Sequence, residues 1–466
     1  MSNDYMNGWD TMVATSQANV NKALVLAYND DKLPHHATGA FTIKMFGMEF
    51  PAYIDADLGP WNLAGGSGKL VIVEIPFTGG TMTIGNITYP LAGVLLDVTC
   101  LLTEIKSPIE HEDGSSDYIF QINFVSPDAI QAVQVKNPPP GIDQNTIDIV
   151  LLNFLKETLG GNTYDIATVN LNGAQQDYAY IIPTLCEYAI DTNTADPNSS
   201  VFGFQMLTIN TVPGNQDIAR GTIPVGTPTC DSAVLLSNQI FVQYILMPGI
   251  VSSLGVSADH LMPVYNAGSW QVVNNGDITL NMDYNPVLSS FNAVINNNLL
   301  DISLTGHVEA SPGITINFNA TATYQLQLTN SGTTQTLDLV QVSHDSSTSV
   351  DVATWVYITT AGLAALMTLV MGPIAGGLVA AVEALIVYIV ATVANNKAGE
   401  LLANSLPLTI SSNVTWTYME VFTIEQALMP MPLQLGGIIP VLNDVPTQDA
   451  HATVGAQNPQ IENHAR

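Results

Sequence analysis

The chain has 466 residues, of which 40 are Asp or Glu and only 10 are Lys or Arg, so its formal net charge is −30. Charged residues make up 11% of the chain, under half of the roughly 25% found in ordinary soluble domains, while 47% are apolar. Nucleic acid is excluded as a partner, because binding it requires clustered Lys and Arg that neutralise phosphates. The length is enough for two or three domains with cores that need no disulfide support.

The three cysteines, Cys100, Cys186 and Cys230, are odd in number, widely spaced and without a C-x-x-C motif. They predict buried apolar thiols rather than a disulfide framework or a zinc site. Residues 1–9 contain neither the basic segment nor the apolar segment of a signal peptide. If the protein leaves the cell, we expect it to use another route or to leave with a partner.

The N-terminal region predicts a helix followed by strands. The apolar residues expected on one face of this helix are Trp9, Val13, Val20, Leu24 and Ala27. Asp10 is in position to cap the helix, and Asn29–Asp31 is expected to end it. Runs rich in Val, Ile, Thr and Phe, separated by Gly, Pro and Asn, predict strands between residues 41 and 125.

The same order of elements then recurs. A second helix is predicted from an N-cap at Asn145 to a stop at Gly160-Gly161, and a third from Asp231 to Met247, each followed by strands. This repeated order predicts two similar α+β modules, residues 1–220 and 221–440, with the boundary in the Pro/Gly-rich stretch 213–228. Residues 441–466 lack periodicity and are expected to form a loose tail.

A very apolar segment occupies residues 352–396, and Glu383 is its only charged residue before Lys397. Gly372-Pro373 divides it, which predicts two helices joined in a hairpin. Each arm has about the length of a bilayer span. In the second arm, ten Leu, Ile and Val contribute roughly −3 to −6 kcal/mol to membrane insertion, whereas Glu383 costs about 3 kcal/mol. We therefore favour helices buried by curved sheets, and membrane insertion remains an alternative.

Several short patterns do not carry chemistry. Gly65–Lys69 lacks the spacing of a phosphate loop and is expected to be a surface turn. Asp55–Gly59 lacks the remaining ligands of a calcium loop and is expected to be a strand-edge turn. His35-His36 and the 111–113 cluster are expected at the surface. No nucleophile–base pair or pair of carboxylates stands out, so we expect neither an enzyme nor a cofactor.

Several strings resemble those of a known family. They are Asn7-Gly8-Trp9-Asp10, Asn19-Val20-Asn21-Lys22, Tyr180-Ile181-Ile182-Pro183-Thr184 with Glu187-Tyr188, and the run from Phe241 to Pro248. The chain resembles, over about residues 6–430, the bacterial TULIP-type (tubular lipid-binding) family typified by the 47-kDa accessory protein of clostridial neurotoxin gene clusters, with its OrfX relatives.

The resemblance implies an α+β fold of two TULIP-like modules, each with long helices wrapped by highly curved antiparallel β-sheets. It implies no catalytic residues. It implies a protein of a neurotoxin or insecticidal toxin cluster that binds lipid or assists toxin delivery. Such a protein would be secreted or associated with the toxin complex without a recognisable signal peptide, and otherwise cytoplasmic until release. Other proteins of the same cluster are then its expected partners, and membrane contact is left open.

We therefore expect a lipid or other hydrophobic ligand between helix and sheet, held by apolar lining residues. These are Val13, Val20, Leu24, Trp355, Ile358, Leu366, Leu385 and Ile389. Because Lys and Arg are scarce, acyl chains are expected to matter more than headgroup charge. The alternatives are a membrane-acting insecticidal toxin that inserts the apolar hairpin, and a structural partner in toxin assembly that holds no ligand.

Overall fold

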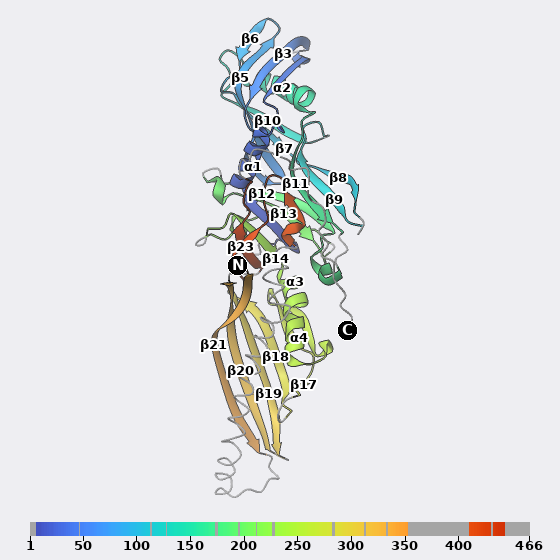
Figure 1. Cartoon of the computed structure of the whole chain (residues 1–466), viewed down its shortest axis with the longest axis vertical. Coiled ribbons are helices and arrows are strands. Elements are labelled where there is room, and N and C mark those ends of the chain that lie inside the picture. The colour runs from blue at the N-terminus through green and yellow to red at the C-terminus, as the bar shows by residue number, and fades with distance from the viewer. Residues whose placement is uncertain are drawn as a thin grey trace, which may run out of the picture.

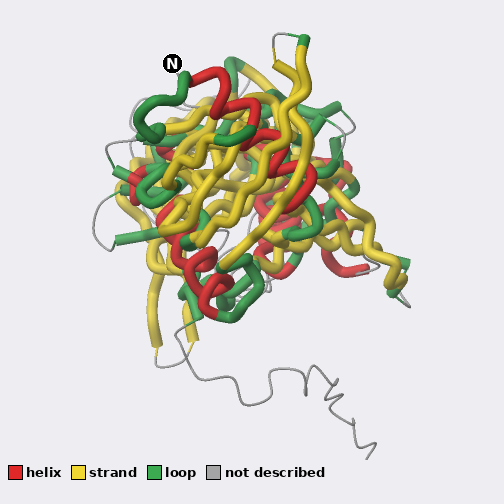
Figure 2. Tube along the Cα trace, turned by 90° about the horizontal axis from the view of Figure 1, so that it is seen from above, coloured by secondary structure: helices red, strands yellow, loops and turns green. Residues whose placement is uncertain are grey.

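The computed structural model describes residues 6–45, 47–111, 114–126, 128–172, 176–193, 196–210, 212–225, 229–281, 285–311, 314–331, 334–352, 410–429 and 432–442. Most of the regular structure in these ranges is antiparallel β-sheet, arranged in an elongated molecule (Figure 1). Seen down the long axis, the strands gather in the middle and the helices lie beside them (Figure 2). The chain therefore folds mainly as β-sheet.

The largest sheet has 13 strands: β1 (Thr11–Ser16), β2 (His36–Met45), β3 (Met48–Leu58), β4 (Asn62–Gly68), β5 (Leu70–Ile84), β6 (Ile87–Pro90), β7 (Leu95–Cys100), β10 (Ile130–Lys136), β12 (Leu185–Asp191), β13 (Val201–Leu207), β14 (Ser232–Leu236), β23 (Thr423–Leu428) and β24 (Leu433–Ile438). Its main path is β10-β7-β5-β4-β12-β13-β1-β14-β24-β23, and β3 and β6 branch from β5, with β2 beyond β3. Strands from residues 1–220 and from residues 221–440 thus share one sheet, and the two-module division stays a prediction.

Two smaller sheets complete the β structure. A four-stranded sheet has the order β22-β11-β9-β8, where the strands are β8 (Thr103–Glu110), β9 (Ser116–Ile122), β11 (Tyr164–Leu171) and β22 (Val414–Trp416). A seven-stranded sheet contains β15 (Leu261–Asn266), β16 (Ser269–Asn274), β17 (Ile278–Thr279), β18 (Val287–Asn296), β19 (Leu299–Ser311), β20 (Ile314–Ser331) and β21 (Thr334–Val352). Its long strands β19 to β21 form the lower part of the molecule in Figure 1.

The helices are short. They are α1 (Gln17–Asn29), α2 (Gln144–Phe154) with the π-helical turn η1 (Leu155–Leu159), and the continuous run of α3 (Asn238–Ile240), the π-helical turn η5 (Phe241–Leu246) and α4 (Met247–Leu254). Four short 3₁₀ helices are η2 (Gln176–Ile181), η3 (Pro197–Ser199), η4 (Arg220–Thr222) and η6 (Ala258–His260). No helical run in the described ranges is longer than 238–254, so the expected long helices are not found there. The predicted hairpin lies outside the described residues, apart from Val352, which ends β21.

The first predicted helix was wrong at its start. Residues Thr11–Ser16 form β1, which pairs with β13 on one side and β14 on the other, and all six are buried. A strand buried on both faces shows no alternation, so the spacing of Trp9 and Val13 did not distinguish strand from helix. Helix α1 begins at Gln17, where the Ser16 side chain caps it by accepting the Asn19 N–H. Its predicted end is confirmed, because α1 stops at Asn29.

Asp10 is buried and does not cap a helix. Its Oδ2 accepts the backbone N–H groups of Thr208, Ile209 and Asn210 at 2.8, 2.9 and 2.9 Å. The Asn210 side-chain amide also donates to Oδ1. In addition, the Asp10 carbonyl accepts the Ser237 N–H at 2.8 Å. The carboxylate therefore fixes the chain after β13 to the entry of β1, and the backbone carbonyl of the same residue holds the start of α3.

The other two predicted helices are confirmed in part. The second begins at Gln144 with Asp143 as N-cap rather than Asn145, and Gly160 follows its π-helical end. The third was wrong before Ser237, because Ser232–Leu236 is the buried strand β14, paired with β1 and β24. Five consecutive buried residues fit a central strand as well as a helix, which explains the error.

One of two predicted turns was wrong, and the other is confirmed only at Gly68-Lys69, where the chain turns from β4 into β5. Asp55 and Asp57 lie on β3, where both carboxylates approach His36 while Ala56 between them is buried. Gly66 lies within β4 at φ +154°, and a Cβ there would stand 2.5 Å from the Leu70 carbonyl oxygen. Glycine is therefore required by close strand contact rather than by a surface loop.

Replacing Asp10 is expected to destabilise the fold severely. In Asp10→Ala three N–H groups lose their acceptor, so we expect the free energy of unfolding to fall by roughly 3–5 kcal/mol. Asp10→Asn keeps one acceptor oxygen and should lose less. Urea unfolding followed by circular dichroism measures this, with the exposed Asp277→Ala as control. An Asp10→Ala midpoint equal to that of the control would contradict the role of this carboxylate.

The prediction of buried thiols is confirmed, since Cys100, Cys186 and Cys230 are all buried and none is part of a disulfide. Burial raises the pKa of Cys100 to about 12 and that of Cys230 to about 11, and the pKa of Cys186 is also raised. Because a raised pKa keeps the thiol protonated, the native protein at pH 8 should react slowly with Ellman's reagent. All three should react at once in denaturant, and rapid reaction of the native protein would refute this.

Candidate functional site

The first candidate site is a groove of about 600 Å³ between α1 and the chain that follows β24. Its lining residues are Asn19, Lys22, Val25, Leu26, Asp231, Ile439, Pro440, Val441 and Leu442. Two sequence segments more than 400 residues apart thus form its walls, because β24 pairs with β14, the neighbour of β1.

The walls of this groove are largely apolar and partly exposed. Val25 and Leu442 each keep 43% of their surface exposed, an unusual position for two aliphatic side chains that line one hollow. The polar groups have partners within the protein. Lys22 Nζ donates to Asn19 Oδ1 at 3.4 Å, and Asp231 Oδ1 accepts the Ile439 N–H at 3.1 Å. The groove therefore offers a ligand an apolar strip bordered by one ammonium group and one carboxylate.

The predicted lining residues of the N-terminal region lie in the hydrophobic core rather than in the lining of this groove. Val13, Val20 and Leu24 have 0–2% of their surface exposed and pack in the main hydrophobic core. Their role as ligand lining stays a prediction. The remaining predicted lining residues, Trp355, Ile358, Leu366, Leu385 and Ile389, lie outside the described residues.

Sequence reasoning missed the groove itself. A signal was present, because Val25 and Leu26 are apolar but lie off the face that the helical periodicity assigned to the core. An amphipathic helix with apolar residues outside its core face has more apolar surface than one sheet can cover. The opposite wall, residues 439–442, could not be linked to α1 without knowing the strand order.

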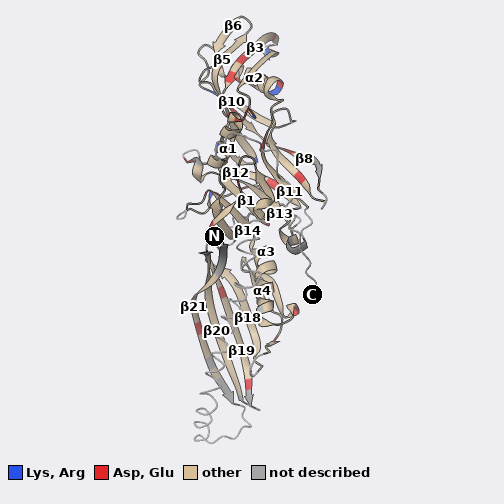
Figure 3. Ribbon diagram, in the orientation of Figure 1, with Lys and Arg blue, Asp and Glu red and all other residues tan. Residues whose placement is uncertain are grey.

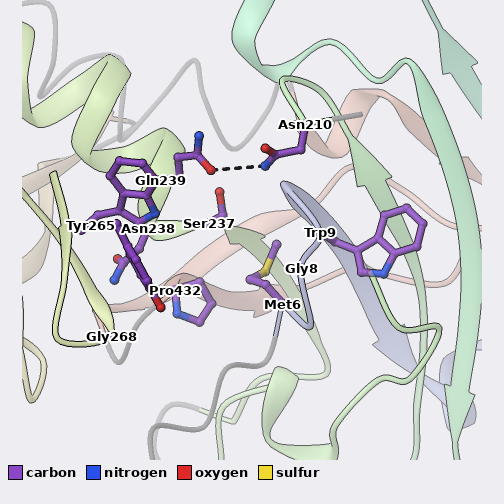
Figure 4. Close-up of a pocket in the computed structure, with 11 residues that line it drawn as sticks. Met6, Gly8, Trp9, Asn210, Ser237, Asn238, Gln239, Tyr265, Gly268 and Pro432 are labelled. Carbon is purple, nitrogen blue, oxygen red and sulfur yellow. Dashed lines mark hydrogen bonds between the residues drawn. The ribbon is translucent and has the colours of Figure 1, made fainter. Parts of the chain in front are cut away.

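The second candidate site is a pocket of about 240 Å³ where the 13-stranded sheet meets the β15–β16 hairpin (Figure 4). Its lining residues are Met6, Gly8, Trp9, Asn210, Ser237, Asn238, Gln239, Tyr265, Gly268, Trp270 and Pro432. None of them is charged, although the chain as a whole carries 40 carboxylates.

Tyr265 and Trp270 form the aromatic side of this pocket. They are direct partners across the β15–β16 ladder, and their ring centroids lie 5.7 Å apart at 53° between planes. The tight turn between the strands places Ala267 and Gly268 at φ +51° and +88°, the two left-handed residues of a type I′ hairpin. Tyr265 is 63% exposed, so its ring is open to a ligand.

Side-chain amides also line this pocket. Asn210 Nδ2 donates to Gln239 Oε1 at 3.3 Å, as the dashed line in Figure 4 shows. The Asn238 Oδ1 atom is buried and accepts no hydrogen bond within the part of the chain that the structure describes. The Trp9 indole points away from Tyr265 in Figure 4, and its N–H donates to the Asn215 carbonyl. Side-chain amides rather than charges thus supply the polar contacts.

The histidines considered for metal binding each face acidic partners at the surface. His35 lies 3.1 Å from Asp31, His36 lies 3.0 Å from Asp57, and His111 lies 2.9 Å from Asp117. In the described ranges, no group of three or more His, Cys, Asp or Glu is placed to hold a metal ion. Lys and Arg are sparse along the described chain (Figure 3). None of the helices in those ranges combines the length and hydropathy of a membrane span.

Comparison with known proteins gives a family match. The sequence matches the family described as OrfX-like, Protein OrfX2/OrfX3/P47, over residues 6–432. No curated protein sequence matches the chain. The structure is similar to P47 from Clostridium botulinum A2, with 16% identity, a TM-score of 0.65, and coverage of 93% of this chain and 97% of that one.

A second P47 structure, from Clostridium botulinum E1, aligns with 14% identity and a TM-score of 0.60, covering 93% of this chain and 99% of that one. At these identities the likeness establishes a shared fold alone. A crystal structure of lipopolysaccharide binding protein aligns with 12% identity and a TM-score of 0.25 over 93% of this chain and 99% of that one, too low to carry an argument. The resemblance inferred from the sequence is confirmed by the family match and the two P47 structures.

Proposed function

The chain belongs to the OrfX-like family, and on that premise we propose that it is a non-enzymatic accessory protein of a bacterial toxin gene cluster that binds a lipid or similar apolar ligand. Its fold likeness to P47 of Clostridium botulinum supports a role in such a cluster. Its proposed partners are other proteins of the same cluster.

One observation carries the ligand proposal, namely the groove beside α1. It joins exposed aliphatic side chains, Val25 and Leu442, in a hollow of about 600 Å³, which is within the size range of small-molecule sites. Each methylene group of an acyl chain that leaves water there contributes about 0.8 kcal/mol. Lys22 is the only Lys or Arg in the lining, and the net charge of −30 repels anions at long range. The acyl chain should therefore contribute more than the headgroup.

The finer architecture is also a proposal. We assign the TULIP type to the two segments 1–220 and 221–440, each with helices packed on curved antiparallel sheets. Helix α1 packs on the 13-stranded sheet, and the 238–254 helical run packs on β15 and β16. This packing supports the assignment. Membrane insertion by residues 352–396 rests on the sequence alone and stays a prediction, as does an assembly role without ligand.

Charge placed in the groove is expected to abolish most binding of a fatty acid. In Val25→Asp a carboxylate would have to be buried against the acyl chain, so we expect the dissociation constant to rise about tenfold or more. Displacement of a fluorescent fatty-acid probe by oleate measures this. Lys22→Gln should change affinity by about threefold or less, because an exposed ion pair is weak.

Ile87→Asp is the matched control, since Ile87 is 58% exposed on β6, away from the groove. It should bind the probe like the unmodified protein. Equal affinity of Val25→Asp and Ile87→Asp would exclude the groove as the site. Failure of the unmodified protein to bind the probe, together with native mass spectra free of lipid, would refute apolar-ligand binding itself.

A further inference from the structure

We propose that the pocket between the 13-stranded sheet and the β15–β16 hairpin binds a neutral sugar, a hexose or N-acetylhexosamine unit of a glycan. The inference concerns a site separate from the groove and does not depend on lipid binding. It rests on the aromatic pair Tyr265 and Trp270, on the side-chain amides that line the pocket with them, and on the uncharged character of the described lining residues.

The aromatic pair of Tyr265 and Trp270 is suited to bind the puckered ring of a sugar. Aromatic faces carry negative potential, so they attract the C–H groups on the face of a sugar. Because the planes of Tyr265 and Trp270 are tilted by 53°, they form no parallel slot for a flat nucleobase. They instead present two differently inclined faces to one ligand. Tyr265, with 63% of its surface exposed, can cover such a ring without any movement of the backbone.

The side-chain amides of the pocket are suited to form hydrogen bonds with the hydroxyl groups of a sugar. A side-chain amide both donates and accepts, as does a hydroxyl, so Asn and Gln can satisfy either polarity. Asn238 also lines the pocket, and its Oδ1 atom accepts no hydrogen bond from the described residues. Gln239 is held in place by the hydrogen bond from Asn210, itself fixed by the buried Asp10. The polar side of the pocket is thereby preorganised from the main sheet.

The uncharged lining argues against anions and metal ions as ligands of this pocket. A phosphate or carboxylate would need Lys or Arg, and the sequence has none between Arg220 and Lys397. A divalent metal ion would need carboxylates, and none of the described lining residues is Asp or Glu. The volume of about 240 Å³ lies below the range of drug-sized sites, which fits one monosaccharide ring.

The test is saturation-transfer NMR of the full-length protein with methyl glycosides of glucose, galactose, mannose, N-acetylglucosamine and N-acetylgalactosamine. We expect at least one to receive saturation on its ring protons. Tyr265→Ala should weaken its affinity roughly tenfold, the factor that a stacking contact supplies. Asn238→Ala should weaken it as well. The same variants on a glycan array distinguish a free sugar from a sugar within a longer chain.

Tyr53→Ala is the control, because Tyr53 is also an exposed tyrosine on a strand but lies on β3, outside the pocket. It should leave sugar binding unchanged. Equal binding by Tyr265→Ala and Tyr53→Ala would refute the assignment of the pocket. So would saturation of none of the five glycosides, or saturation of adenosine in their place. Circular dichroism spectra identical to that of the unmodified protein show that Tyr265→Ala is folded.

Discussion

The structure depends on β1, a six-residue strand at the centre of the largest sheet. Its backbone pairs with β13 from the N-terminal part of the chain and with β14 from the C-terminal part, so loss of its register would separate the two. Asp10 secures that register at one end. A buried carboxylate is costly, yet here three backbone N–H groups and an amide satisfy it, and it joins the start of β1 to the chain after β13. The buried carboxylate of Asp10 thus specifies the position of β1, a strand whose six residues are all buried.

Both candidate sites follow from this strand, because they lie at its opposite ends. Antiparallel pairing brings Asn210, just after β13, and Ser237, just after β14, to the start of β1, where the uncharged pocket opens. The same pairing brings Asp231 and Ile439 to its far end, where α1 begins and the apolar groove runs. The sites therefore share one rigid element, and each is completed by a more peripheral one, the β15–β16 hairpin or the chain after β24.

The sequence predicted the family, the dominance of β structure after the first helix, the second helix and the buried thiols, because each depends on local pattern or on strings of residues. It failed at Thr11–Ser16 and Ser232–Leu236, where strands buried on both faces lack alternation. It also failed to bring Leu442 to Val25 or Tyr265 to Gln239, because those proximities arise from strand order. Periodicity reports which face of an element is covered, but not which distant segment covers it.

The scarcity of charge gives these sites their common character. With 40 carboxylates and 10 basic side chains, the chain carries enough negative charge to resist self-association, and anionic ligands meet a repulsive field. Neither site offsets that field, since the groove contributes one lysine and the pocket none. Recognition must then rest on apolar contact in the groove and on stacking and neutral hydrogen bonds in the pocket. These interactions are little affected by salt, so such a protein would keep its ligands over a wide range of ionic strength.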